Sequence, residues 1–271
     1  MKRYLKYIII GIVAVALYTL LFPKKEKEKS EPRDYQAIVE SGVLRAVTEY
    51  NSISYFADGD TVSGFHYELL NAFARSKGLA PEITPEMSFE KRQEGILTGK
   101  YDILANSTIV TSESKDSLLF THPILLNKQV LVQRKPEQEN DSMYIHSQLE
   151  LARKTLHVVK GSPALLRIHN LSNEIGDTIY IQEVEKYGPE QLLAMVAHGD
   201  IDYTVCDESI AQASINDFPQ LDIETAISFT QFYSWGVSKH SPILLDSLNA
   251  WLDTYTQTPE FRELQKKYYN K

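Results

Sequence analysis

A pattern that occurs twice, 100 residues apart, constrains the fold of this chain more than any other feature. The segments "GILTGKYDILANS" (95–107) and "AMVAHGDIDYTVCDES" (194–209) each read as the end of a helix, a glycine, an aspartate and an apolar strand. The aspartates are Asp102 and Asp202, and polar residues end each strand. Because ligands bind at the carboxyl ends of strands in open α/β sheets, we expect two similar lobes that face each other across a polar cleft.

The rest of the chain fits the same architecture. From residue 43 onward, short apolar strands alternate with amphipathic helices, which is typical of layered α/β proteins. A glycine at the end of a helical pattern and a Ser-Pro pair at the start of one mark several of the boundaries. We expect strands at 43–48, 101–107 and 155–162, and helices at 64–78, 88–99, 162–176, 189–198, 207–217, 241–256 and 259–269.

The charge distribution excludes one broad class of function. Residues 1–34 hold eight Lys/Arg and four Asp/Glu, and the rest of the chain holds 20 and 32, so the body of the protein carries a net charge of −12. Nucleic-acid binding depends on Lys and Arg that neutralise phosphates, and the sequence contains no basic stripe. We therefore expect no nucleic-acid binding. The apolar fraction of 43% is enough for packed cores, so we expect a folded protein.

Cysteine and histidine usage argues against disulfides and metal sites. Cys206 is the only cysteine, so a disulfide within the chain is impossible. The seven histidines form no zinc-type spacing with cysteine or with one another. We expect no metal and no cofactor. Within "YTVC", Cys206 is predicted to be a small buried residue and not a nucleophile.

The N-terminus carries an apolar stretch that is suited to a membrane. The 16 residues from Tyr7 to Phe22 contain no charge, slightly fewer than the roughly 20 of a spanning helix, and lysines flank them on both sides. A small-x-small cleavage pattern occurs only inside the stretch, at 14–16, which favours an uncleaved single-pass anchor over a removed signal sequence. Residues 1–22 are thus predicted to be a membrane anchor or signal sequence, and 23–38 a charged tether.

Five ordered motifs between residues 39 and 269 resemble those of a known family. They are "GVLRAVTEYNSISYFADGDTVSGFHYELLNAFARSKGL", "LTGKYDILANSTIVTSES", "VVKGSPALL", "HGDIDYTVCDES" and "TPEFRELQKKYY". The set resembles the type 2 periplasmic solute-binding proteins of extracellular family 3. It is most similar to the solute-binding-like module at the front of the membrane-bound lytic murein transglycosylases F.

The resemblance implies an α/β, two-lobed type 2 periplasmic-binding-protein fold with two crossing strands, preceded here by one N-terminal transmembrane helix. The crossings would lie near 126–134 and 229–238. Lobe 1 would comprise 39–128 plus 235–271, and lobe 2 would comprise 129–234. Binding proteins of this kind close on their ligand by a hinge motion.

The resemblance also implies that this chain is not an enzyme. Transglycosylase activity in the similar proteins belongs to a separate C-terminal lysozyme-like domain with a catalytic glutamate. The chain ends at Lys271, where that domain would begin. We therefore expect only the binding half of such a protein here.

Several ligand contacts follow from the resemblance. In amino-acid binders an arginine after "T-x-E" grips the ligand carboxylate through a bidentate fork, whereas "TSES" ends here in Ser114, so a ligand other than a free amino acid is expected. Asp207 matches the carboxylate that meets the ligand's ammonium group, with helix N-capping as an equal alternative. Ser162 matches a hydroxyl residue at a helix N-terminus, where capping is again as good an explanation, and Lys160 could supply a substitute cation.

Polar residues after the first strands of lobe 1 complete the predicted site. Tyr50 and Tyr55 lie where the family often has an aromatic lid, but Tyr55 fits the core equally well. Glu68 and Trp235 are expected to be structural, Glu68 at a helix near the hinge and Trp235 in the core. The predicted ligand-binding residues are Asn51, Ser52, Asn106, Ser107, Thr108, Ser114, Ser162 and Asp207.

Three functions are consistent with these observations. The first is a binding protein tethered to the bacterial inner membrane, or soluble in the periplasm after cleavage, that recognises a small polar ligand such as an amino-acid derivative or cell-wall peptide. Its partner would be an ABC-type permease or a cell-wall enzyme. The second is a regulatory or interaction module without a ligand. The third, an enzyme similar to periplasmic dehydratases, needs a general acid and base, for which Glu113, Asp207 and Glu208 are candidates.

Overall fold

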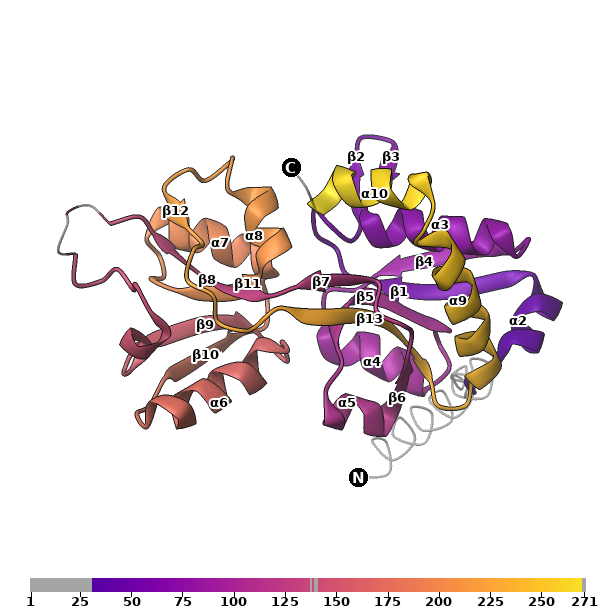
Figure 1. Ribbon diagram of the computed structural model, residues 1–271, viewed down its shortest axis with the longest axis horizontal. Helices are drawn as coiled ribbons and strands as arrows, with labels where there is room; N and C mark the ends of the chain where they lie inside the picture. The colour runs from indigo at the N-terminus through magenta and orange to yellow at the C-terminus, as the bar shows by residue number, and fades with distance from the viewer. Residues whose placement is uncertain (1–30, 137, 139–140, 270–271) are drawn as a thin grey trace, which may run out of the picture. The chain divides into compact units, whose positions relative to one another are not determined.

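The computed structural model describes residues 31–136, 138 and 141–269 (Figure 1). The predicted anchor at 7–22 and residues 23–30 of the predicted tether lie outside these residues. Within the described ranges, no helix combines the length and the apolar character needed to cross a membrane.

The first lobe is built on a six-stranded mixed sheet. Its strands follow the order β4-β1-β5-β13-β6, and β7 also pairs with β13. Strands β1, β4 and β5 are parallel, whereas β13 runs antiparallel to its neighbours. The strands are β1 (Val43–Thr48), β4 (Ala80–Pro85), β5 (Ile103–Ile109), β6 (Leu118–Phe120), β7 (Leu125–Asn127) and β13 (Gln231–Ser238), beside the hairpin β2 (Phe56–Asp58) and β3 (Thr61–Ser63). The helices are α2 (Tyr35–Ser41), α3 (Phe65–Ser76), α4 (Phe89–Leu97), α5 (Ser112–Ser117), α9 (Pro242–Tyr255) and α10 (Pro259–Tyr269).

The second lobe is built on a five-stranded sheet with the order β10-β9-β11-β8-β12. Strands β9, β10 and β11 are parallel, and β8 is antiparallel to β11 and β12. The elements are β8 (Gln129–Arg134), the 3₁₀ helix η1 (Gln148–Leu151), β9 (Thr155–Val159), α6 (Ala164–Ile175), β10 (Tyr180–Val184), α7 (Pro189–His198), β11 (Thr204–Asp207), α8 (Glu208–Ser214) and β12 (Leu221–Asp222).

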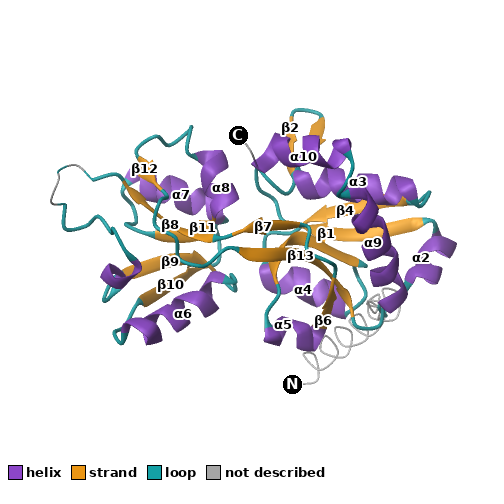
Figure 2. Ribbon diagram, in the orientation of Figure 1, coloured by secondary structure: helices purple, strands orange, loops and turns teal. Residues whose placement is uncertain are grey.

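Alternating side chains place helices on both faces of the second sheet. Successive residues of a strand point to opposite faces, so Leu131 packs with the residues of α6 and Val132 with those of α7. Val205 and Cys206 divide between the same two clusters. Figure 2 shows α6 on one side of this sheet and α7 and α8 on the other. Both faces of β8 and β11 are therefore covered, and every residue of these strands except Arg134 and Asp207 at their ends is buried.

The core of the first lobe gathers around α3 and the crossing strand β13. The predicted stripe of Phe65, Leu69 and Phe73 is fully buried, in one cluster with Trp235. On the other face of the sheet, Leu104 packs with Ile96 of α4. The two clusters use alternate residues of β5, so the sheet is covered by helices on both sides.

The chain passes between the two sheets twice. Strand β7 pairs with β13 in the first sheet, and after one linking residue β8 begins at Gln129 in the second. On the return, Ala226 still bridges to Val130, and β13 joins the first sheet from Gln231 (Figure 1). The predicted return at 235 lies inside β13, because the pairing of β13 with β7 starts four residues earlier.

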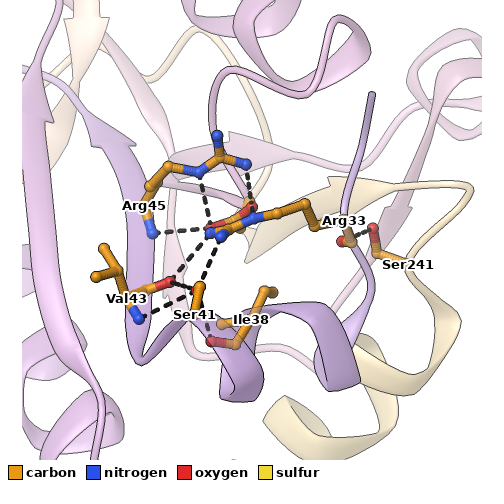
Figure 3. A network of polar contacts seen from close by, with 7 residues as sticks. Arg33, Ile38, Ser41, Val43, Arg45 and Ser241 are labelled. Atoms are coloured by element: carbon orange, nitrogen blue, oxygen red, sulfur yellow. Dashed lines mark hydrogen bonds and ion pairs between the residues drawn. The ribbon is translucent and has the colours of Figure 1, made fainter. Parts of the chain in front are cut away.

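The segment before β1 is fastened to the first lobe. Asp102 is fully buried at its side chain and pairs with Arg33 at 2.5 Å and with Arg45 at 2.8 Å. Arg33 also donates to Ser41 Oγ, and its carbonyl oxygen accepts from Ser241 (Figure 3). The tether predicted to reach residue 38 therefore overlaps an ordered part of the lobe, which includes helix α2.

The repeated pattern has the same local structure in both lobes. Gly99 and Gly199 follow α4 and α7 with φ angles of 71° and 82°, the left-handed conformation that glycine adopts without strain. Asp102 and Asp202 each pair with arginine, and in both lobes a central strand comes next. The pattern therefore predicted equivalent joints in the two sheets.

Candidate functional site

A polar cavity of about 60 Å³ lies between the two lobes. We refer to it as the interlobe cavity. Cys206 and apolar residues such as Phe89, Val205 and Ile210 form part of its wall. Its polar and charged lining consists of Glu49, Arg92, Asn106 and Ser107 from the first lobe and Gln129, Lys160, Ser162 and Asp207 from the second.

Strand ends explain why these groups meet. Glu49 directly follows β1, and Asn106 and Ser107 belong to the second half of β5. Asp207 is the last residue of β11, and Lys160 directly follows β9. Because parallel strands of one sheet end at the same edge, each lobe presents its polar residues along one edge. This is the arrangement that the repeated sequence pattern predicted.

Asp207 is the most perturbed acid of the cavity. The pKa of its carboxyl group is raised to about 7: burial is the main cause, the hydrogen bond from Tyr233 opposes the shift, and the nearby Glu49 adds to it. The Tyr233 hydroxyl donates to Asp207 Oδ1 at 2.8 Å. Burial also raises the pKa of Tyr233 far above its ordinary value, so this hydroxyl keeps its proton and remains a donor.

Arg92 of α4 forms a charged part of the cavity wall. The residue is only 4% exposed. Its Nη1 donates to the main-chain oxygens of Glu86 at 2.6 Å and Met87 at 2.9 Å. Its Nη2 lies 3.8 Å from Glu49 Oε1, which is an ion pair but too long for a hydrogen bond. The cavity thus contains a buried cation beside two carboxylates.

Hydrogen bonds join the lobes around the cavity. The Ser52 amide of the first lobe donates to Glu190 Oε1 at the start of α7, at 2.8 Å. Asn127 Nδ2 of β7 donates to Ser209 Oγ of α8 at 2.9 Å. Ligand pockets for drug-sized molecules have roughly 300 Å³ or more, so the lobes as they stand leave little room for a guest. The structure is a closed arrangement.

Four of the predicted site residues line the interlobe cavity, namely Asn106, Ser107, Ser162 and Asp207. Asp207 occupies the N-cap position of α8, but its side chain makes no capping hydrogen bond and turns to Tyr233 instead. Ser162 is not the N-cap of α6, because Pro163 holds that position; the Ser162 hydroxyl accepts from the Ala164 amide at 3.2 Å.

The other four predicted residues do not line the cavity. Asn51 Oδ1 accepts from the amides of Ile53 and Ser54, so this side chain shapes the turn after β1. Ser52 contributes its amide to the contact between lobes. Thr108 is buried and donates to Asn106 Oδ1 at 3.0 Å.

Ser114 has a structural role at the start of α5. Its hydroxyl accepts from the Thr111 amide at 2.9 Å, and its own amide donates to Thr111 Oγ1 at 3.1 Å, which together form a capping box. A separate small cavity of about 20 Å³ is lined by Ser114, Thr108, Phe89 and Arg92. Gln93, Leu104 and Leu118 complete its lining, and among these side chains that share the cavity with Ser114 only Arg92 carries a charge.

Lys160 is not an unpaired cation. Its Nζ forms an ion pair with Glu185 at 2.5 Å near the surface, and this hydrogen bond raises the pKa of Lys160. Tyr50 is exposed and lies 6.2 Å from the Tyr55 ring, centre to centre.

Three further residues have structural environments. Trp235 is completely buried, and its Nε1 donates to His66 Nδ1 at 3.0 Å. Glu68 accepts from Lys267 at 2.7 Å and from Tyr268 at 2.5 Å, which ties α3 to α10. Cys206 is buried, and burial raises the pKa of its thiol well above the ordinary value, which disfavours the thiolate needed for nucleophilic attack.

Sequence reasoning missed Glu49, Arg92, Gln129, Tyr233 and Glu190. A signal existed for Arg92, which shares the spacing of the apolar residues Phe89 and Ile96 on α4 and so places a charge on the buried stripe. Glu49 directly follows β1, and the parallel neighbour β5 carries Asn106 and Ser107 in its second half, so the strand-end rule applies to Glu49 as well.

The chain forms two α/β lobes, passes between them at two crossings, and encloses a cavity with polar lining between the lobes. This is a bilobal binding-protein architecture. The chain belongs to the bacterial extracellular solute-binding proteins, family 3, whose family model matches residues 44–271. The resemblance stated from the motifs is confirmed.

Known relatives and structures agree with this assignment. Membrane-bound lytic murein transglycosylase F of Photobacterium profundum is 26% identical over 266 residues, which cover 95% of this chain and 50% of that protein. This chain spans about half the length of the curated relatives it matches. The match is to the solute-binding family, and the comparisons provide no evidence for a catalytic transglycosylase domain in this chain.

Solved structures share the fold. A mutant of ArgBP from T. maritima superposes with a TM-score of 0.74 at 23% identity, covering 87% of this chain and 99% of that one. An ancestral amino acid-binding protein, described as a precursor of cyclohexadienyl dehydratase, gives a TM-score of 0.72 at 21% identity, covering 86% and 98%. The chain therefore has the mixed-sheet α/β fold of periplasmic amino-acid binding proteins.

Proposed function

We propose that this protein binds a small polar ligand in the interlobe cavity and does not catalyse a reaction. The observation that carries the proposal is the convergence of strand-end polar groups from both lobes on Asp207, a partly buried carboxylate whose pKa is raised by burial. Such a group gains most from a ligand that brings a compensating positive charge. An amino-acid derivative or a cell-wall peptide has the required amino group.

Binding requires the lobes to separate. A cavity of about 60 Å³ is too small for such a ligand. The two crossings, near Lys128 and between Ala226 and Gln231, are the short segments about which the lobes can rotate. A ligand's ammonium group would then replace the Tyr233 hydroxyl as a partner of Asp207.

One observation favours a second candidate, a regulatory module that closes without a ligand. Asp207 already has a hydrogen-bond partner in Tyr233, and Glu190 joins the lobes through Ser52. In that case the closed form itself would be the surface recognised by a partner, such as a cell-wall enzyme or an ABC-type permease.

We further propose that the apolar stretch 7–22 anchors the protein in the bacterial inner membrane, with the two lobes in the periplasm. Cell fractionation with a C-terminal tag tests this directly. Recovery in the membrane fraction and extraction only by detergent are expected. A periplasmic product that is free of residues 1–16 would refute the anchor.

A thermal-unfolding screen with amino acids, their derivatives and peptidoglycan fragments separates the two functions. A binding protein gains stability in proportion to the logarithm of ligand concentration above the Kd. At least one compound is expected to raise the Tm. No shift with any of them at millimolar concentration would refute ligand binding and favour the regulatory module.

A further inference from the structure

The guanidinium group of Arg92, which lines the interlobe cavity, has one edge that makes no hydrogen bond. Arginine has five N–H donors on three nitrogen atoms. Among the three side-chain nitrogens of Arg92, only Nη1 makes hydrogen bonds to described residues, namely to the main-chain oxygens of Glu86 and Met87. Its Nε is buried and has no partner among the described residues. A buried charged donor without a partner is costly, so it indicates a group that the ligand supplies.

The two unused donors, Nε and Nη2, lie on one edge of the planar guanidinium group. Nη2 has only the 3.8 Å contact with Glu49, which is not a hydrogen bond. Nε and Nη2 together form the side-on fork that binds the two oxygens of a carboxylate. Because Nη1 is held by two main-chain carbonyl oxygens, this fork is already oriented and loses little entropy on binding.

We propose that Arg92 binds the carboxylate of the ligand and takes over the role that Ser114 cannot perform. The inference rests on the proposed function and specifies its ligand as a zwitterion. Ser114 is engaged in the capping box of α5, and it shares the small second cavity with Arg92, so the cation lies beside the position of the missing arginine.

The opposite charge of the ligand has its own partners. Asp207 and Glu49 both line the interlobe cavity and are close enough for Glu49 to raise the pKa of Asp207. An amino group between them would relieve their mutual repulsion. Gln129 also lines the cavity, and its buried Oε1, which has no partner among the described residues, is a further acceptor. The cavity thus offers acceptors for an ammonium group and one fork for a carboxylate.

The test compares acids with their amides. The probes are the common amino acids, their D enantiomers and alanyl-alanine dipeptides, each paired with its C-terminal amide, and calorimetric titration gives the Kd. The wild-type protein is expected to bind at least one acid and to bind its amide about 30-fold more weakly, as loss of a charge-assisted fork implies. Arg92→Gln is expected to weaken binding of the acid about 100-fold and to leave the amide within a factor of about three.

Arg134 provides a matched control. Its Nη1 also donates to two main-chain oxygens, those of Val196 and Ile201, but it lies in the second lobe outside the interlobe cavity. Arg134→Gln therefore removes a comparable structural contact and is expected to leave the affinity for the acid unchanged. If Arg92→Gln does not fold, Arg92→Lys keeps the charge without the fork and is expected to bind the acid about tenfold more weakly.

Each outcome has a distinct meaning. Equal binding of acid and amide by the wild-type protein, or full affinity of the Arg92 variants for the acid, overturns the role of Arg92 while ligand binding stands. Loss of affinity in Arg134→Gln as well would show a general structural effect and overturn it too. If the wild-type protein binds none of these probes, the proposed function fails, and this inference fails with it.

Discussion

Replacing Asp207 by asparagine should stabilise this protein at neutral pH. The amide has the size of the carboxyl group and still accepts from the Tyr233 hydroxyl, which lies 2.8 Å away in the native protein. What disappears is the charge, which burial and Glu49 disfavour. Asp207→Asn therefore isolates the cost of holding an ionised group in a ligand-binding position.

The magnitude follows from the pKa of about 7 in the folded protein against an ordinary value of 3.8. A difference of this size corresponds to about 4 kcal/mol at high pH, at about 1.36 kcal/mol per pH unit. Because Asp207 retains partial exposure, we discount this to about 2 kcal/mol. For a domain of this size, that is a Tm increase of about 4–8 °C.

The pH dependence has a definite sign. At about pH 3 the carboxyl group is mostly protonated in both states and the substitution has little electrostatic effect. As pH rises through 3.8 the unfolded chain ionises first, so the wild-type protein loses stability relative to the variant until about pH 7, and the difference is constant above that. The advantage of Asp207→Asn should therefore grow between about pH 4 and pH 7.

Thermal unfolding at about pH 4 and about pH 8 measures this advantage. Asp246→Asn is the control, because Asp246 is exposed on α9 and its substitution should leave the Tm unchanged at both values. The reasoning is refuted if Asp207→Asn is no more stable than the wild-type protein at the higher pH, or if its advantage is the same at the lower one.

Two further predictions concern the contact between lobes and the helix ends. Glu190→Ala removes the acceptor of the Ser52 amide and so weakens the contact that holds the lobes together, which should increase the radius of gyration in X-ray scattering. Glu190→Gln keeps an acceptor and should not change the radius. Equal radii for Glu190→Ala and the wild-type protein would contradict this role of Glu190. Gly99→Ala brings a Cβ to 2.2 Å from the Glu31 main chain, whereas Gly42→Ala meets no atom within 4 Å. In urea unfolding Gly42→Ala should cost about 1 kcal/mol from its positive φ alone, and Gly99→Ala clearly more; equal costs would contradict the clash.

Local patterns were sufficient for much of the fold. The repeated helix–glycine–aspartate–strand pattern located equivalent joints in both sheets, and the stripe of Phe65, Leu69 and Phe73 identified the buried face of α3. Strand ends placed Ser107 and Asp207 on the same cavity. These features depend on residues close together in the chain, so periodicity and turn chemistry report on them directly.

The balance of charges in the cavity depended on tertiary contacts. The Tyr233 partner of Asp207 comes from the antiparallel strand β13, whose position follows from strand pairing between distant segments. Arg92 lies on a helix whose rotation against β5 decides whether it meets the core, the solvent or the cavity. The sequence showed that Ser114 stands where amino-acid binders have their carboxylate-binding arginine. Only the packed structure placed an arginine, Arg92, beside Ser114, because these side chains come from different helices and meet only when α4 and α5 pack within the first lobe.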